Sequence, residues 1–149
     1  MAGDVAMDVF GWVGTCIALF FFISPCTLMY GLIVGKKTLV DIPWILLLAN
    51  CANCILWTVY GLQQFDDKVQ VWACNSVGSL INIVYLCIYF VHLVQKQPAQ
   101  SFGIIVLTLG ICTLIFMVFY IYVKYEVVGV VAMVFNIIMY AAPAQRIVI

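Results

Sequence analysis

The sequence predicts an all-α membrane protein that contains a repeated helical motif. Of its 149 residues, 67% are hydrophobic and only 8% are charged, and the mean hydropathy is +1.21. A soluble chain of this length could not bury so much apolar surface, because folded surfaces carry polar groups. Gly11 and Pro25 in the first apolar run recur as Gly129 and Pro143 in the last, both at an offset of 118 residues.

Five apolar runs are long enough to cross a bilayer, which takes about 20 residues per helix. The predicted helices cover approximately residues 9–34, 42–62, 69–94, 102–122 and 127–149. Charged and turn-forming residues separate them at 35–38, 63–68, 95–98 and 124–126. Because these breaks are short, consecutive helices are expected to be antiparallel neighbours.

The basic residues at the breaks favour one orientation in the membrane. Four of them fall on one predicted side, Lys36, Lys37, Lys96 and Arg146, against Lys68 and Lys124 on the other. An excess of Lys and Arg marks the cytoplasmic side. The N-terminus is therefore expected outside and the C-terminus in the cytoplasm. The plasma membrane is the expected location, with a vacuolar or other internal membrane as the alternative.

Composition and spacing argue against several classes of function. The net charge is zero, so nothing favours nucleic acid as a partner. Cys51 and Cys54 match a CxxC pattern, but His92 is the only histidine and lies on another helix, so no metal site or other cofactor is expected. No nucleophile–base pair or paired carboxylates point to an enzyme.

The polar residues within the apolar runs suggest a neutral ligand. No charged residue lies deep in a run, which favours a facilitator over an ion-coupled pump. Asparagine amides donate and accept hydrogen bonds, which suits a polyhydroxylated solute, although asparagines also join membrane helices. At helical spacing, polar stripes are formed by Asn50, Cys54, Trp57 and Gly61, by Asn53, Trp57 and Tyr60, by Asn75, Gly78, Ser79 and Asn82, and by Asn136, Tyr140 and Pro143. Trp57 suits either stacking on a sugar ring or anchoring at the membrane interface.

Three prolines are expected near the cytoplasmic ends of their helices. A proline removes a backbone hydrogen bond and weakens a helix locally. Pro25, Pro43 and Pro143 therefore suggest a set of hinges at one membrane face. Pro43 also fits the start of a helix.

Together these motifs resemble the SWEET family of sugar transporters, within the PQ-loop group. The matching segments are Ser24-Pro25, Ile42-Pro43, Trp57-Thr58-Val59-Tyr60-Gly61, Asn75-Ser76-Val77-Gly78 and Asn136-Ile137-Ile138-Met139-Tyr140-Ala141-Ala142-Pro143. The resemblance implies two parallel three-helix bundles joined by a linker helix. On this template residues 1–94 form the first bundle, 95–126 the linker helix with its flanking loops, and 127–149 the first helix of the second bundle, which makes five spans of an expected seven.

The resemblance also implies bidirectional, facilitative transport of mono- or disaccharides by alternating access, without ion coupling. It makes Asn75 the pocket asparagine and places Pro25, Pro43 and Pro143 in a cytoplasmic proline tetrad. With the polar stripes added, the candidate substrate-binding residues are Asn75, Trp57, Cys54, Asn136 and Ser79. The candidate gating or hinge residues are Pro25, Pro43, Pro143, Tyr60 and Gly61.

Two further hypotheses concern the two template helices that the sequence does not include. The chain is expected to be a fragment or a short form that works in the bilayer as a homo- or hetero-oligomer. It is alternatively a non-transporting protein that associates with full-length transporters and modulates them. Another PQ-loop carrier, such as an amino-acid exporter, is the remaining alternative.

Overall fold

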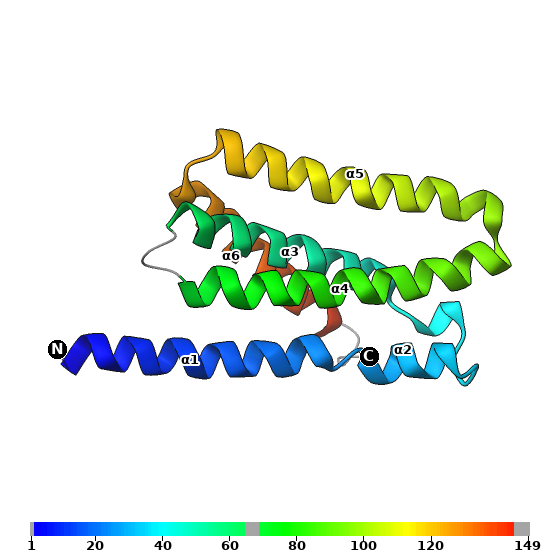
Figure 1. The fold of residues 1–149 in the computed structure, drawn as a ribbon, viewed down its shortest axis with the longest axis horizontal. Coiled ribbons are helices and arrows are strands. Elements are labelled where there is room, and N and C mark those ends of the chain that lie inside the picture. The colour runs from blue at the N-terminus through cyan, green and yellow to red at the C-terminus, as the bar shows by residue number, and fades with distance from the viewer. Residues whose placement is uncertain (1, 65–68, 145–149) are drawn as a thin grey trace.

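The computed structural model describes residues 2–64 and 69–144, and the side chains of 9–64, 69–99 and 101–137. Over these ranges the chain is helical and contains no strand (Figure 1). The elements are α1 (Ala2–Ile23), α2 (Cys26–Ile33), the short 3₁₀ helix η1 (Leu39–Asp41), α3 (Trp44–Gln63), α4 (Val69–Lys96), α5 (Pro98–Tyr122) and α6 (Tyr125–Ala144). The predicted all-α class is confirmed.

Four of the five predicted spans are present as helices long and apolar enough to cross a membrane. They are Val9–Ile33, which runs through α1 and α2, Trp44–Gln63, Val69–Lys96 and Ser101–Tyr122. In α6 the stretch Tyr125–Ile137 is apolar but shorter, and the helix continues to Ala144. The fifth span stays a prediction, because the remaining residues 145–149, including Arg146, lie outside the described part.

The first span is interrupted between α1 and α2 at Pro25, the position where the sequence predicts a weak point. Pro25 has no N–H, and the Ser24 hydroxyl donates instead to the carbonyl of Phe21 at 2.9 Å. From α4, the Tyr85 hydroxyl donates to the carbonyl of Phe22 at 3.2 Å. Side chains therefore supplement the backbone bonds at the interruption, where the Phe21 carbonyl also accepts from the Ser24 N–H at 3.3 Å.

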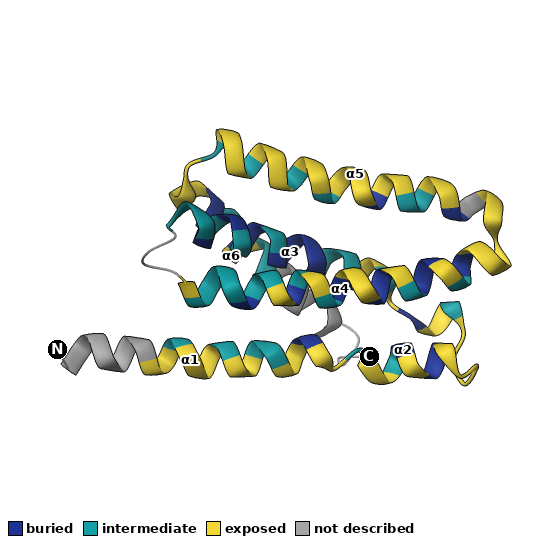
Figure 2. Ribbon diagram, viewed as in Figure 1, coloured by how far each residue is buried: buried dark blue, intermediate teal, exposed yellow. Residues whose placement is uncertain are grey.

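Helix α3 is central to the bundle. It packs against α4, α5 and α6, while α4 also packs against α1 and α2. Figure 1 shows α3 and α4 between α1 on one side and α5 on the other. The buried residues concentrate on α3 and α4, and α5 is largely exposed (Figure 2). The main apolar core comprises Met29, Leu32, Ile42, Leu47, Cys51, Tyr85, Leu86, Tyr89, Phe90 and Leu93.

Glycines allow two of these helix pairs to approach closely. A Cβ at Gly61 would lie 2.7 Å from the backbone nitrogen of Trp72 on α4. A Cβ at Gly78 would lie 2.5 Å from the Phe22 ring on α1. Small residues at such contacts are typical of membrane helices. Gly61, a predicted gating residue, thus lies where α3 meets α4, and its gating role stays a prediction.

Gln63, the last residue of α3, connects this helix to the end of α5. Its Nε2 donates to the carbonyls of Phe119 at 3.2 Å and Val123 at 2.9 Å. The last carbonyls of a helix lack intrahelical partners, so a side-chain donor there stabilises the terminus. The contact also fixes the turn from which α6 begins.

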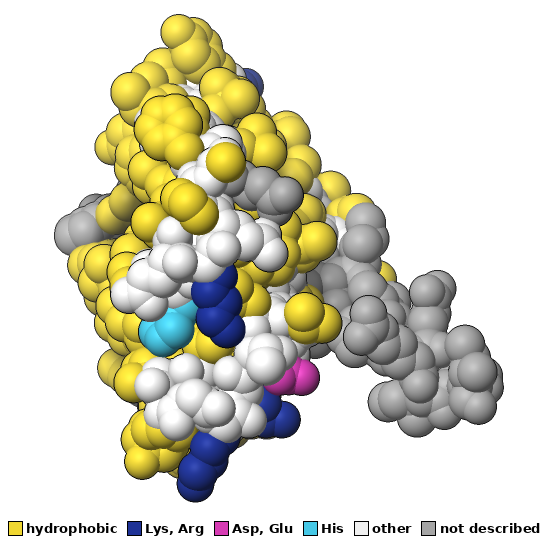
Figure 3. Space-filling view, turned by 90° about the vertical axis from the view of Figure 1, so that its right-hand side faces the viewer, with side chains coloured by type: hydrophobic (Ala, Val, Ile, Leu, Met, Phe, Trp, Pro, Cys, Tyr) yellow, Lys and Arg dark blue, Asp and Glu magenta, His cyan; other side chains and the backbone are white. Residues whose placement is uncertain are grey.

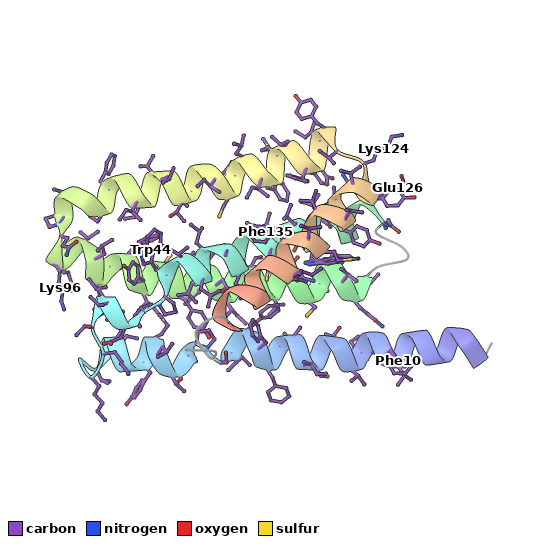
Figure 4. The ribbon with its side chains drawn as sticks, turned by 180° about the vertical axis from the view of Figure 1, so that it is seen from behind. Phe10, Trp44, Lys96, Lys124, Glu126 and Phe135 are labelled. Atoms are coloured by element: carbon purple, nitrogen blue, oxygen red, sulfur yellow. The ribbon has the colours of Figure 1, made fainter. Side chains whose placement is uncertain are left out.

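The described charged side chains lie at the two ends of the bundle. Lys96 is at one end, and Lys124 and Glu126 are at the opposite end (Figure 4). Figure 3 looks onto the first of these ends and shows lysines gathered there with the histidine. Within this end, the backbone N–H and hydroxyl of Thr38 donate to the Asp41 carboxylate at 2.7 and 2.9 Å, which lowers the pKa of Asp41 below its ordinary value.

Candidate solute-binding site

A cavity of about 300 Å³ lies between α1, α3, α4 and α6. This volume is at the lower end of the range for small-molecule sites. Three helices contribute five amide side chains to its lining: Asn50, Asn53, Gln70, Asn75 and Asn136. The other lining residues are Gly11, Gly14, Thr15, Ala18, Phe21, Phe22, Trp57, Val71 and Cys74. None of these lining residues is charged, and we call this space the central cavity.

The polar stripes explain how the amides reach the cavity. Asn50, Asn53 and Trp57 follow a spacing of three and four residues, so they share one side of α3. Asn75 comes from α4 and Asn136 from α6, which packs against α3. Three predicted binding residues, Trp57, Asn75 and Asn136, therefore meet around one space.

Two asparagine pairs link the helices beside the cavity. Asn50 Nδ2 donates to Asn82 Oδ1 at 3.2 Å, joining α3 to α4. Asn53 Nδ2 donates to Asn136 Oδ1 at 2.8 Å, joining α3 to α6. Asn75 instead donates to its own helix, from Nδ2 to the Val71 carbonyl at 2.8 Å. The Oδ1 of Asn75 makes no hydrogen bond within the described ranges and is free to accept one from a ligand.

The other two predicted binding residues do not line the central cavity. Cys54 is 0% exposed and packs with Phe22 and Cys74 in a small apolar cluster. The Ser79 hydroxyl donates to the Ser76 carbonyl at 2.9 Å. In this conformation neither side chain lines the central cavity, so a binding role for either one requires a different arrangement of the helices.

Two of the predicted hinge prolines meet at a second cavity. This space of about 230 Å³ is lined by Pro25, Pro43, Ser24, Leu28, Met29, Leu46, Leu47, Phe21 and Asn50. Pro43 lies directly before α3, as expected for a helix start. The third proline, Pro143, and Tyr140 have side chains outside the described ones. We call this space the proline cavity.

A third hollow, of about 290 Å³, lies between α3 and α6 and contains the predicted gating residue Tyr60. Tyr60 packs edge-on against Trp57, with ring centroids 5.6 Å apart. The hollow is lined by Trp57, Tyr60, Tyr125, Glu126, Gly129, Val130 and Met133. We call it the outer hollow.

The three spaces form a row along the bundle. Phe21 and Asn50 line both the proline cavity and the central cavity. Trp57 lines both the central cavity and the outer hollow. Neighbouring spaces therefore share one or two lining side chains.

Sequence reasoning missed several residues of this site. Asn50 and Asn53 belong to the predicted stripes but not to the predicted binding residues. Gln70 lies in the first turn of α4, beside a predicted break, where polar residues are ordinary. Tyr85 lines none of the three spaces but bonds to the carbonyl of Phe22 beside the central cavity. It carries no sequence signal, because that bond depends on the interruption at Pro25.

The two cysteines of the CxxC pattern contribute to helix packing. Cys51 and Cys54 are both buried on α3, and the Cys51 thiol contacts the Ser79 carbonyl at 4.0 Å. No group of three or more His, Cys, Asp or Glu side chains that could hold a metal ion occurs among the described residues.

Apolar helices of membrane-spanning length indicate an integral membrane protein, and within it the described residues surround an uncharged, amide-lined cavity. The family model described as "Sugar efflux transporter for intercellular exchange" matches residues 8–97. The chain therefore belongs to this family of SWEET transporters.

Individual relatives agree with this assignment. The chain is 32% identical over 147 residues to the bidirectional sugar transporter SWEET7 of Arabidopsis thaliana, covering 94% of this chain and 57% of the relative. It is 29% identical over 144 residues to the bidirectional sugar transporter SWEET1a of Oryza sativa subsp. japonica, covering 93% and 52% respectively. The chain thus spans just over half the length of these relatives, which are named as transporters and not as enzymes.

A solved eukaryotic SWEET transporter has the same fold. The two structures superpose with a TM-score of 0.79 at 24% sequence identity, over 97% of this chain and 70% of the other. The match confirms the predicted SWEET-like arrangement of helices.

Proposed function

We propose that this chain forms the sugar-binding part of a facilitative, bidirectional sugar transporter. The observation that carries the proposal is the central cavity, in which five amide side chains and no charged side chain line the wall. A neutral sugar offers several hydroxyls that both donate and accept, so it matches amides well and needs no counter-charge. The names of the relatives, all sugar transporters, support the same solute class.

The row of three spaces supports alternating access as the mechanism. In this proposal, Phe21 and Asn50 separate the bound sugar from the proline cavity, and Trp57 separates it from the outer hollow. Movement of α2 about Pro25 and of the start of α3 at Pro43 opens the first boundary. No ionisable group takes part in these boundaries, which agrees with transport that is not coupled to an ion.

We further propose the division of the chain that the sequence predicts. Residues 1–94 form one bundle, 95–126 the linker, and 127–149 the first helix of a second bundle. In support, α5 lies on the opposite side of α3 and α4 from α1 (Figure 1) and contributes nothing to the lining of the central cavity.

The proposed orientation in the plasma membrane places Lys96 in the cytoplasm and Lys124 outside. In intact cells, a membrane-impermeant maleimide should label Lys124→Cys and leave Lys96→Cys unlabelled until the cells are permeabilised. The unaltered chain supplies the background from its own cysteines. Labelling of Lys96→Cys alone from outside would reverse the orientation.

Sugar uptake into liposomes that contain the chain tests the proposed function. These 149 residues surround the central cavity with four helices, whereas the solved transporter extends well beyond the matched part. We therefore expect saturable glucose or sucrose uptake only where two or more chains associate, so that uptake per chain rises with the protein-to-lipid ratio. A sodium or proton gradient should leave the rate unchanged.

The other possible results of the liposome experiment decide between the remaining hypotheses. Saturable uptake by a species shown to be monomeric would contradict the need for a partner. Absence of both binding and uptake at every ratio would contradict the proposed function. If sugar uptake by a full-length relative changes when this chain is co-reconstituted, although the chain alone transports nothing, the modulator hypothesis is favoured instead.

A further inference from the structure

Asn53 and Asn136 form a hydrogen-bonded pair of amides in the wall of the central cavity. Asn53 Nδ2 donates to Asn136 Oδ1 at 2.8 Å, and both residues line the cavity. Asn53 is only 6% exposed. Its carbonyl oxygen Oδ1 is buried and has no hydrogen-bond partner in the part of the chain that the structure describes. A buried acceptor without a partner is unfavourable, so this oxygen calls for a donor.

The pair uses only part of the hydrogen-bonding capacity of two amides. Each amide has an acceptor oxygen and an NH₂ group with two donors. When this bond is formed, Asn53 still has its acceptor Oδ1 and Asn136 still has a donor on Nδ2. These two groups are only a few atoms apart. Turning both amides over exchanges these roles between the two residues, so the pair presents one acceptor beside one donor in either arrangement.

Building on the proposed function, we infer that the Asn53–Asn136 pair binds two adjacent hydroxyl groups of the sugar. One hydroxyl donates to Asn53 Oδ1, and its neighbour accepts from Asn136 Nδ2. Because a hydroxyl both donates and accepts, a vicinal diol satisfies both groups at once. Asn53 is thus a further substrate-binding residue, and α6 takes part in selecting the solute through Asn136.

A diol matches the pair with one hydroxyl for each group. A carboxylate group by itself offers acceptors alone and would face the Asn53 oxygen without a proton between them. The pair therefore favours a diol over an isolated carboxylate group.

A deoxy-sugar series tests the inference directly. Binding of glucose and its monodeoxy analogues to the purified chain in lipid nanodiscs can be titrated by saturation-transfer NMR, which suits weak ligands. We expect removal of either of two adjacent hydroxyls to weaken binding about tenfold, the effect of losing one hydrogen bond to a buried group. Removal of the hydroxyls elsewhere on the ring should matter less, apart from any that meets Asn75.

Variants then assign each hydroxyl to its residue. Asn53→Leu keeps the branched shape of the side chain and removes its hydrogen-bonding groups. In this variant the removal of one of the two adjacent hydroxyls should no longer weaken binding, because its amide partner is gone, and glucose should bind only as well as that deoxy analogue. In Asn136→Leu the removal of the other hydroxyl of the adjacent pair should no longer weaken binding. Such a cycle between ligand and side chain isolates the pairwise interaction. Thr58→Val removes a hydroxyl from α3 that bonds to the Cys54 carbonyl away from the cavity, and it should keep the full pattern.

The possible failures are distinguishable. If the unaltered chain binds sugar but its two sensitive hydroxyls are not adjacent, or if Asn53→Leu keeps the full pattern, the inference is wrong while the proposed function stands. If either leucine variant fails to fold, the series on the unaltered chain still decides whether an adjacent pair is recognised. If the unaltered chain binds none of these sugars, both proposals fall.

Discussion

Asn75→Ala should weaken sugar binding about tenfold and reduce sugar flux accordingly, with no loss of membrane insertion. The Asn75 side chain lines the central cavity from α4, and its Oδ1 is not engaged within the described ranges. Truncation removes an acceptor for the solute, and one lost hydrogen bond of this kind corresponds to about a factor of ten in affinity. The measurement is a glucose titration of the purified variant, with flux under the associating conditions described above.

A structural role would give a different result. The only bond that Asn75 makes among the described residues joins it to Val71 in its own helix, so its loss should leave thermal stability nearly unchanged. Asn82→Ala is the matched control, because Asn82 is 0% exposed and bonds to Asn50 without lining the cavity. That control should lower stability more than Asn75→Ala. Unchanged binding by Asn75→Ala would remove this residue from the site.

Gly61→Ala is expected to destabilise the bundle by about 1–3 kcal/mol, the usual cost of overpacking a tight contact. The added Cβ would lie 2.7 Å from both the backbone nitrogen and the Cβ of Trp72. Backbone atoms cannot turn aside as the end of a flexible side chain can, so α3 and α4 must separate. Thermal unfolding of the chain in detergent measures the effect.

Gly110→Ala provides the control for this substitution. Gly110 lies on α5, where an added Cβ has nothing within 4 Å. Removing that glycine should leave stability unchanged or slightly raise it, because alanine is the better helix former. Equal effects of the two substitutions would mean that α3 and α4 do not approach as closely as described.

The helices were predictable because two strong signals agree. Apolar runs of about 20 residues define the spans, and the breaks between them hold nearly all the charges. Pro25 and Pro43 also lie where expected, at the interruption of the first span and at the start of α3. Proline acts on the local backbone, so its effect depends little on the rest of the fold.

The site was less predictable, because periodicity gives the side of a helix but not the neighbour that it meets. Cys54 and Asn50 belong to one predicted stripe, yet Asn50 lines the central cavity and Cys54 packs in an apolar cluster. Asn53 belongs to a predicted stripe, but its importance depends on α6 bringing Asn136 within 2.8 Å. Such contacts between helices arise from tertiary packing, which cannot be derived from the periodicity of a single sequence.

The central claim, that the amide-lined cavity is the sugar site, is tested most directly by photo-crosslinking. A glucose derivative carrying a small diazirine is irradiated with the chain in nanodiscs, and the modified peptides are located by mass spectrometry. We expect labelling of cavity-lining residues on α3 and α4, around Trp57 and Asn75, and its suppression by excess glucose. Labelling confined to the outer surface of α5, or labelling that glucose does not suppress, would contradict the account.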